Sequence, residues 1–150
     1  DLVDPFSRRL FFVPDPVEFK IETESPLVKE APWHPDNPEL GMREEKVNSG
    51  DTVYLPGEEI QGATELRLKN LCNVTVENKS LKFSGFDHKR GNPIIQWCCR
   101  HRMMELFYPD GNSGIGVVED KITGLDGEVV QFERVGFVSL GDNKAFFLHR

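Results

Sequence analysis

The sequence predicts an all-β fold, most simply one of closed or nearly closed barrels. Its 150 residues include 10 prolines and 13 glycines, which divide the chain into short runs of alternating apolar and polar residues. No window of helix length carries the i, i+3, i+4, i+7 apolar spacing of an amphipathic helix. Turn signals recur near the interval of roughly 8 to 12 residues that is typical of sandwiches and barrels. Barrels are favoured because they leave few strand edges exposed.

The alternating runs give the expected strands in chain order. An apolar run around Phe11 precedes the first strand, and residues 24–44 form a long proline-bearing connection, which is typical of either a functional or a disordered loop. The last two strands flank the turn Gly141-Asp142-Asn143-Lys144 and predict a hairpin, and we expect the two ends of the chain to meet. The expected strands are residues 17–23, 51–55, 64–69, 71–77, 79–86, 93–99, 103–108, 114–119, 128–138 and 144–149.

The charge is unevenly distributed. The formal net charge of −7 argues against a nucleic-acid binder, because phosphate contacts require Lys and Arg. Residues 67–102, however, hold 8 basic and 2 acidic side chains, a local excess of +6. Salt screens exposed charges beyond about 8 to 10 Å, so a basic face can attract RNA despite a remote acidic surface. The alternative is that solvated strand faces simply alternate in sign.

Cysteine usage and hydropathy indicate a cytoplasmic protein. Three cysteines cannot all pair within the chain, and a disulfide between the adjacent Cys98 and Cys99 would distort the peptide between them. We therefore expect reduced, buried thiols. No apolar run approaches the roughly 18 residues of a membrane span, and no leader pattern is present. The chain begins with Asp1, so we expect a piece of a longer protein.

Five motifs follow one another along the chain, at residues 9–17, 34–43, 65–70, 93–97 and 131–134. In this order they resemble the C-terminal anticodon-binding region of class I glutamyl- and glutaminyl-tRNA synthetases, and the resemblance covers nearly all of the chain. The end of the chain, residues 145–150, looks most like the archaeal glutamyl branch. The resemblance implies two small packed β-barrels, a proximal one of about residues 6–61 plus 112–150 and a distal one of about residues 62–111.

Arg9 and Gln131 are the first candidate RNA-binding residues. The resemblance implies that both contact the central uridine of the anticodon. A guanidinium offers a planar fork of donors, and an amide both donates and accepts, which suits the mixed edge of an unpaired pyrimidine. Without the resemblance, Arg9 could equally be a surface arginine paired with Asp4 or Asp15, and Gln131 an ordinary solvent-facing residue.

Arg67 and Lys69 stand two apart, so on a strand they share one face, and Asn70 completes their motif. In the glutaminyl relatives both matching positions are Arg and are implied to read the first anticodon base. Lys lacks the bidentate fork, so we expect Lys69 to contact phosphate instead of base. The short acidic segment 56–62 departs from the glutaminyl pattern implied to read the third base, and it favours a glutamyl enzyme.

Further RNA-binding candidates are Arg43, in a Gly-Met-Arg turn, and Arg134, at the end of the Gln-Phe-Glu-Arg motif. Arg100 and Arg102 could add backbone contacts. Exposed aromatic side chains can stack splayed bases, but at 10% of the chain most aromatic residues are expected in the cores. The aromatic candidates are Trp33, Trp97, Phe86 and Tyr108.

No catalytic constellation is visible. Cys98 and His101 invite a metal or nucleophile interpretation, but no second ligand pair follows at a finger-like spacing. We therefore expect neither a metal nor a cofactor in this chain. The resemblance implies that ATP and Mg belong to a catalytic domain of the parent chain, and that this chain binds the anticodon loop of glutamate tRNA. The alternatives are the same domain of a glutaminyl enzyme, or a β-barrel that binds a basic protein partner.

Overall fold

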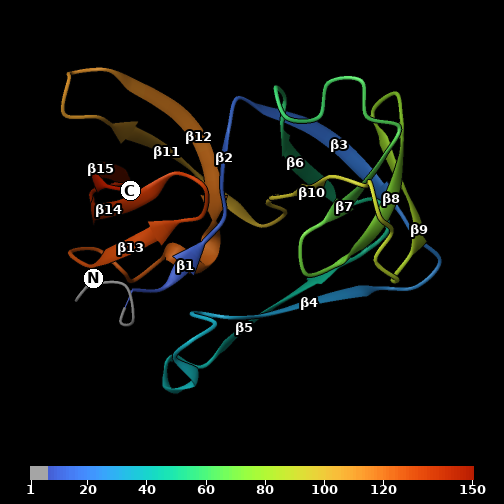
Figure 1. Cartoon of the computed structure of the whole chain (residues 1–150), viewed down its shortest axis with the longest axis horizontal. Helices are drawn as coiled ribbons and strands as arrows, with labels where there is room; N and C mark the ends of the chain where they lie inside the picture. The colour runs from blue at the N-terminus through green and yellow to red at the C-terminus, as the bar shows by residue number, and fades with distance from the viewer. Residues whose placement is uncertain (1–6) are drawn as a thin grey trace.

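The computed structural model describes residues 7–150, which form an all-β protein of two sheets and a projecting hairpin (Figure 1). The predicted fold class is confirmed. Two short 3-10 turns, η2 (Pro38–Leu40) and η3 (Asp120–Ile122), are the helical elements of the described residues. No helix in this part of the chain is both long and apolar enough to cross a bilayer.

The two ends of the chain build one seven-stranded sheet, here called the terminal sheet. Its strands are β1 (Arg9–Leu10), β2 (Phe12–Pro14), β11 (His101–Phe107), β12 (Ser113–Glu119), β13 (Val129–Phe132), β14 (Gly136–Gly141) and β15 (Lys144–His149). They lie in the order β1-β13-β14-β15-β11-β12-β2. β1 runs parallel to β13, and β2 runs antiparallel to β12, so the ends of the chain meet as expected.

The second sheet curls into a nearly closed barrel (Figure 1). Its strands are β3 (Pro16–Glu22), β6 (Thr52–Pro56), β7 (Glu65–Leu68), β8 (Cys72–Glu77), β9 (Ser80–Gly85) and β10 (Ile94–Ile95). They lie in the order β10-β7-β8-β9-β3-β6. A β-bridge between Tyr54 and Cys98, with N to O distances of 2.8 and 3.2 Å, links the two edges of this sheet. Tyr54 lies on the edge strand β6, and Cys98 lies in the segment that follows the other edge strand, β10.

The hairpin formed by β4 (Leu27–Pro32) and β5 (Met42–Val47), here called the hairpin arm, runs beneath both sheets (Figure 1). The expectation of an irregular connection over residues 24–44 is therefore wrong. Inward-facing positions of the arm alternate with exposed ones, but three of them hold charged residues, Lys29, Arg43 and Glu45. Strand patterns are recognised by alternating apolar residues, so buried charges conceal this hairpin.

The sheets pack through a shared apolar core. Phe11, Val13 and Val117 of the terminal-sheet region belong to the same buried cluster as the barrel interior, which includes Trp97. A second cluster fills the other side of the terminal sheet, where the Phe12 and Phe132 rings stack with centroids 4.9 Å apart.

Two other strand expectations need correction. The run 128–138 is two strands, because Arg134 takes a φ of 67° and turns the chain back between β13 and β14. The run 93–99 pairs as a strand only at Ile94–Ile95, since the chain then crosses toward Tyr54.

Strand pairing also groups the chain differently from the expected barrels. Strands β3 and β6, which fall in the first expected barrel, pair within the same sheet as β7, β8 and β9, whereas β11 joins the chain ends. Residue 6, at the expected boundary, lies outside the described residues. Long-range partners of this kind leave no local signal in the sequence.

Candidate nucleic-acid interface

Arg9 and Gln131 are register partners on the adjacent parallel strands β1 and β13. Side chains at register partners project from the same face of a sheet, so these two lie side by side although they come from opposite ends of the chain. The backbone fixes the pair: Gln131 N donates to Arg8 O at 2.9 Å, and Arg9 N donates to Trp33 O at 2.7 Å. The second bond also fastens the hairpin arm to β1.

Two acceptor oxygens near this pair receive no hydrogen bond within the described protein. They are Gln131 Oε1 and Glu133 Oε2, and both atoms are buried. A buried acceptor without a donor costs about 1 to 3 kcal/mol, so such atoms are uncommon without a ligand to complete them. The arrangement suits a ligand that brings N–H groups.

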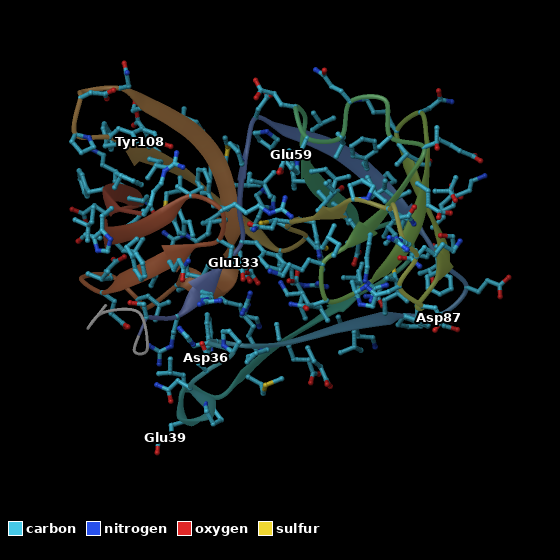
Figure 2. All side chains as sticks on the ribbon, in the orientation of Figure 1. Asp36, Glu39, Glu59, Asp87, Tyr108 and Glu133 are labelled. Atoms are coloured by element: carbon cyan, nitrogen blue, oxygen red, sulfur yellow. The ribbon has the colours of Figure 1, made fainter. Side chains whose placement is uncertain are left out.

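Beside the pair lies a small pocket of about 170 Å³, here called the Arg9 pocket. It is formed where β1, the hairpin arm and the turns after β7 and β13 converge, and Figure 2 shows Glu133 near this junction. Four of the seven RNA-binding candidates line it. The lining residues are Arg9, Ala31, Pro32, Pro35, Arg43, Lys69, Asn70 and Glu133.

Lys69 is held at the pocket by both its backbone and its side chain. Its N donates to Ile95 O at 3.0 Å, and its O accepts from Trp97 Nε1 at 2.9 Å. Lys69 Nζ lies 3.1 Å from Glu133 Oε1, and both side chains retain some exposure. Asn70, with a φ of 63°, turns the chain at this point. The pocket therefore presents cations and one carboxylate together.

Arg43 lines the pocket, but it is buried and its donors are used inside the protein. Its Nε lies 3.0 Å from Glu119 Oε1, and its Nη1 donates to Pro32 O at 2.9 Å. Lys29 Nζ contacts the same carboxylate at 2.5 Å. Burial alone would raise the pKa of Glu119, but the two cations outweigh it and hold that pKa below its ordinary value. Arg43 therefore supports the wall of the Arg9 pocket from the protein interior.

The structure does not bring Arg67 and Arg134 to the Arg9 pocket. Arg67 Nη1 donates to Asn73 Oδ1 at 3.1 Å and to Phe86 O at 2.8 Å, on the barrel face. Arg134 Nη1 lies 2.8 Å from Glu59 Oε1, and its Nη2 donates to Ile94 O at 2.7 Å. Arg67 and Lys69 therefore face different partners, and Arg134 connects the terminal sheet to the barrel.

The basic residues 67–102 do not form one continuous patch. Arg100 pairs with Glu45 and Asp51 next to the hairpin arm, whereas Arg102, on β11, contacts Thr123 after η3 and Asn143 in the turn between β14 and β15. Asp4, one alternative partner of Arg9, lies outside the described residues. Among the aromatic candidates, Trp97 is fully buried, whereas Phe86 and Tyr108 are 61% and 39% exposed.

Sequence reasoning missed Glu133, although it lies inside the Gln131–Arg134 motif. An acidic residue is easily passed over in an expected RNA site, and only its contact with Lys69 reveals its position. It also missed the support from Lys29 and Glu119, which come from distant strands. In residues 7–150 no three or more His, Cys, Asp or Glu side chains gather as metal ligands would.

Residues 7–87 match the family described as "tRNA synthetases class I (E and Q), anti-codon binding domain". Over 99% of its length, the chain is 37% identical to a glutamate–tRNA ligase of Thermoplasma volcanium. It is 35% identical to that of Pyrococcus abyssi over 93% of the chain, and 37% identical to that of Sulfolobus acidocaldarius over 95%. The chain spans only 27% to 28% of the length of these three relatives.

Proposed function

Because the chain belongs to the class I glutamyl- and glutaminyl-tRNA synthetase family, as its anticodon-binding domain, we propose that it recognises the anticodon loop of glutamate tRNA. The glutamyl assignment is supported by relatives that are named glutamate–tRNA ligases. It is also supported by the short acidic segment 56–62, which lacks the basic residues implied for third-base reading in the glutaminyl branch.

The observation that carries the proposal is the side-by-side placement of Arg9 and Gln131 next to a pocket of mixed charge. The edge of an unpaired uracil presents two carbonyl oxygens and one N–H. Arg9 can donate to a carbonyl, and Gln131 Oε1, which accepts nothing from the described protein, can accept from the N–H. Sequence-specific RNA recognition commonly targets splayed loop bases in this way.

Lys69 supplies a second kind of contact at the same pocket. Its ammonium group is a compact charge without the planar fork of Arg, so it favours phosphate over a base edge. Glu133 holds it in place in the free protein. Phosphate contacts set the position of the loop, and the pair Arg9 and Gln131 reads the base.

Chemistry would take place elsewhere in the parent chain. The relatives are over three times longer, and a catalytic domain there would join glutamate to tRNA with ATP and Mg²⁺. This domain contributes orientation of the bound tRNA, together with a penalty for wrong anticodons that leave buried donors or acceptors unpaired. We place the protein in the cytoplasm, where tRNA is charged.

Titration of the 150-residue chain with anticodon stem-loops of glutamate and glutamine tRNA, at several salt concentrations, tests the proposal. We expect the glutamate stem-loop to bind more tightly, with affinity that falls as salt rises. Preference for the glutamine stem-loop would assign the domain to the glutaminyl branch. Binding to neither stem-loop would favour a protein-interaction module instead.

A further inference from the structure

Residues 86–92 cross the outer face of the barrel. It joins β9 to β10, which lie on opposite sides of the β7–β8 pair, so the chain must pass over that pair. It passes on the side of Arg67 and Asn73, because Leu66 and Leu68 are fully buried on the other side. Residues 86–92 are here called the crossing segment.

Side chains of the barrel fasten the crossing segment at three points. Arg67 Nη1 donates to Phe86 O at 2.8 Å, and Asn73 Nδ2 donates to Asp87 O at 2.5 Å. Further along, Asn92 Nδ2 donates to Glu65 Oε1 at 2.7 Å. The backbone at Phe86 is therefore held in one place.

Phe86 is 61% exposed despite this fixed backbone. One edge of its ring meets the Phe83 ring, with centroids 4.9 Å apart and planes at 60°. The ring also lines a pocket of about 820 Å³, together with Phe83, Pro26 and Leu27. A pocket of several hundred cubic ångströms is large enough for a nucleotide base. Figure 2 shows the adjoining Asp87 at the outer end of the barrel.

Cationic side chains lie near Phe86 in the pocket and in the crossing segment: Lys82 lines the same pocket, and Lys89 and Arg90 follow Phe86 along the chain. Lys89 pairs with Glu65 and Lys82 with Glu77, and both lysines are about half exposed, so these surface pairs are weak and the ammonium groups can exchange to phosphate. Arg90, also exposed, has no hydrogen bond or ion pair in the described structure. Glu22 and Glu24 also line the pocket, with Glu22 the register partner of Lys82, and their carboxylates can accept from amino groups of a base.

The crossing segment is fastened to β7, the strand that leads to Lys69 and the proposed anticodon site. Arg67 and Gly85 occupy one row across the sheet, two strand spacings or about 10 Å apart, and Lys69 follows Arg67 by two residues. Arg67 and Phe86 therefore lie within reach of a nucleotide chain bound at the Arg9 pocket.

We propose that Phe86 is a stacking platform for one unpaired base of the anticodon loop, and that Arg90 and Lys89 contact the adjacent phosphates. This rests on the proposed function, since the same RNA must occupy the Arg9 pocket. Stacking on an aromatic ring tolerates any base, because every base has a π-face. The platform adds affinity and orders the loop, while Arg9 and Gln131 supply sequence preference.

The test compares Phe86→Ala, Phe86→Trp and the matched control Phe146→Ala, in the 150-residue chain, against the glutamate stem-loop. Phe146 is 46% exposed on the terminal sheet and stacks on Phe107. We expect Phe86→Ala to weaken binding by about 5- to 150-fold, the loss of one base stack, whereas Phe86→Trp retains binding and the control changes little. Circular dichroism checks that each variant is folded.

Abasic replacement of each loop nucleotide in turn identifies the stacked base. At one position the effect of Phe86→Ala should vanish, because the stack is already missing. Arg90→Ala should lower the slope of log affinity against log salt by about 0.7, the value for one single-stranded phosphate contact, whereas Phe86→Ala should leave that slope unchanged.

The outcomes separate this inference from the proposed function. Loss of binding in Arg9→Ala with unaltered binding in Phe86→Ala would overturn the platform and leave the anticodon site standing. An effect of Phe86→Ala on binding that persists with every abasic stem-loop would also overturn the stacking platform. No binding by the unsubstituted chain would overturn both.

Discussion

Lys29 Nζ and Glu119 Oε1 lie 2.5 Å apart in the protein interior, where both side chains are 1% exposed. Lys29 belongs to the hairpin arm and Glu119 to the terminal sheet. The same carboxylate accepts from Arg43 Nε at 3.0 Å and from Phe11 N at 2.7 Å, so one residue holds both strands of the arm against the chain that follows Arg9. The wall of the Arg9 pocket depends on this network.

The first prediction is that Glu119→Gln strongly destabilises the protein. The substitution keeps the shape but removes the carboxylate that pairs directly with the buried ammonium of Lys29 and the buried guanidinium of Arg43. Removing one partner of a buried ion pair typically costs about 3 to 5 kcal/mol. Urea unfolding measures the change in free energy of unfolding.

Glu77→Gln is the matched control. Its pair with Lys82 is about half exposed on both sides, so its loss should cost no more than about 1 kcal/mol. Equal effects of the two substitutions would show that the interior pair is no more important than a surface pair.

The second prediction concerns the stability of the protein at low pH. The pKa of Glu119 is held below its ordinary value of 4.5 by Lys29 and Arg43, against the opposing effect of burial. A carboxylate with a lowered folded-state pKa contributes stability that is present above pH 4.5 and is lost as pH falls through the folded pKa. Unfolding free energies below pH 4.5 should therefore fall more steeply in the parent than in Glu119→Gln. Parallel curves would contradict this.

Most strands could be predicted from the sequence because their inward positions are apolar, as at Leu66 and Leu68 of β7. The hairpin arm could not, because Lys29, Arg43 and Glu45 occupy inward positions and find their partners on distant strands. Alternating hydrophobicity in the sequence indicates which residues are buried only where the buried side chains are apolar.

The candidate site residues likewise include some that the sequence could place and others that it could not. Motif resemblance selected Arg9, Lys69 and Asn70, which converge on one pocket, but it could not separate them from Arg67. The difference arises at the end of β7, where Asn70 turns the chain with a positive φ and Lys69 is drawn toward Glu133. Such a turn redirects a side chain in a way that strand spacing does not predict.

The third prediction is that the native thiols react slowly. Burial raises the pKa of Cys72 and of Cys99 to about 12, and it raises the pKa of Cys98 well above the ordinary value. The thiolate is the reactive form, so at pH 8 a chromogenic disulfide reagent should modify the folded chain far more slowly than the urea-unfolded chain, in which all three thiols are accessible. Rapid modification of the folded chain would contradict the burial of these groups.

The fourth prediction is that Arg9→Ala and Gln131→Ala each weaken binding of the glutamate stem-loop by about 1 to 3 kcal/mol, the scale of one good base contact. Because the two side chains are neighbours on one sheet face, their effects should be less than additive in the double variant. Fluorescence titration measures both. Arg150→Ala and Gln61→Ala, at exposed positions of the same residue types, are the controls.

The fifth prediction distinguishes Lys69 from its neighbours by salt. If Lys69 contacts phosphate, Lys69→Ala should weaken binding of every stem-loop equally and lower the salt slope by about 0.7. Glu133→Gln removes the carboxylate that Lys69 contacts at 3.1 Å, so it should leave the ammonium freer for phosphate and steepen the salt dependence. Titrations of both variants at four salt concentrations measure these slopes. A change in preference between glutamate and glutamine stem-loops in Lys69→Ala, at constant slope, would instead mean that Lys69 reads a base.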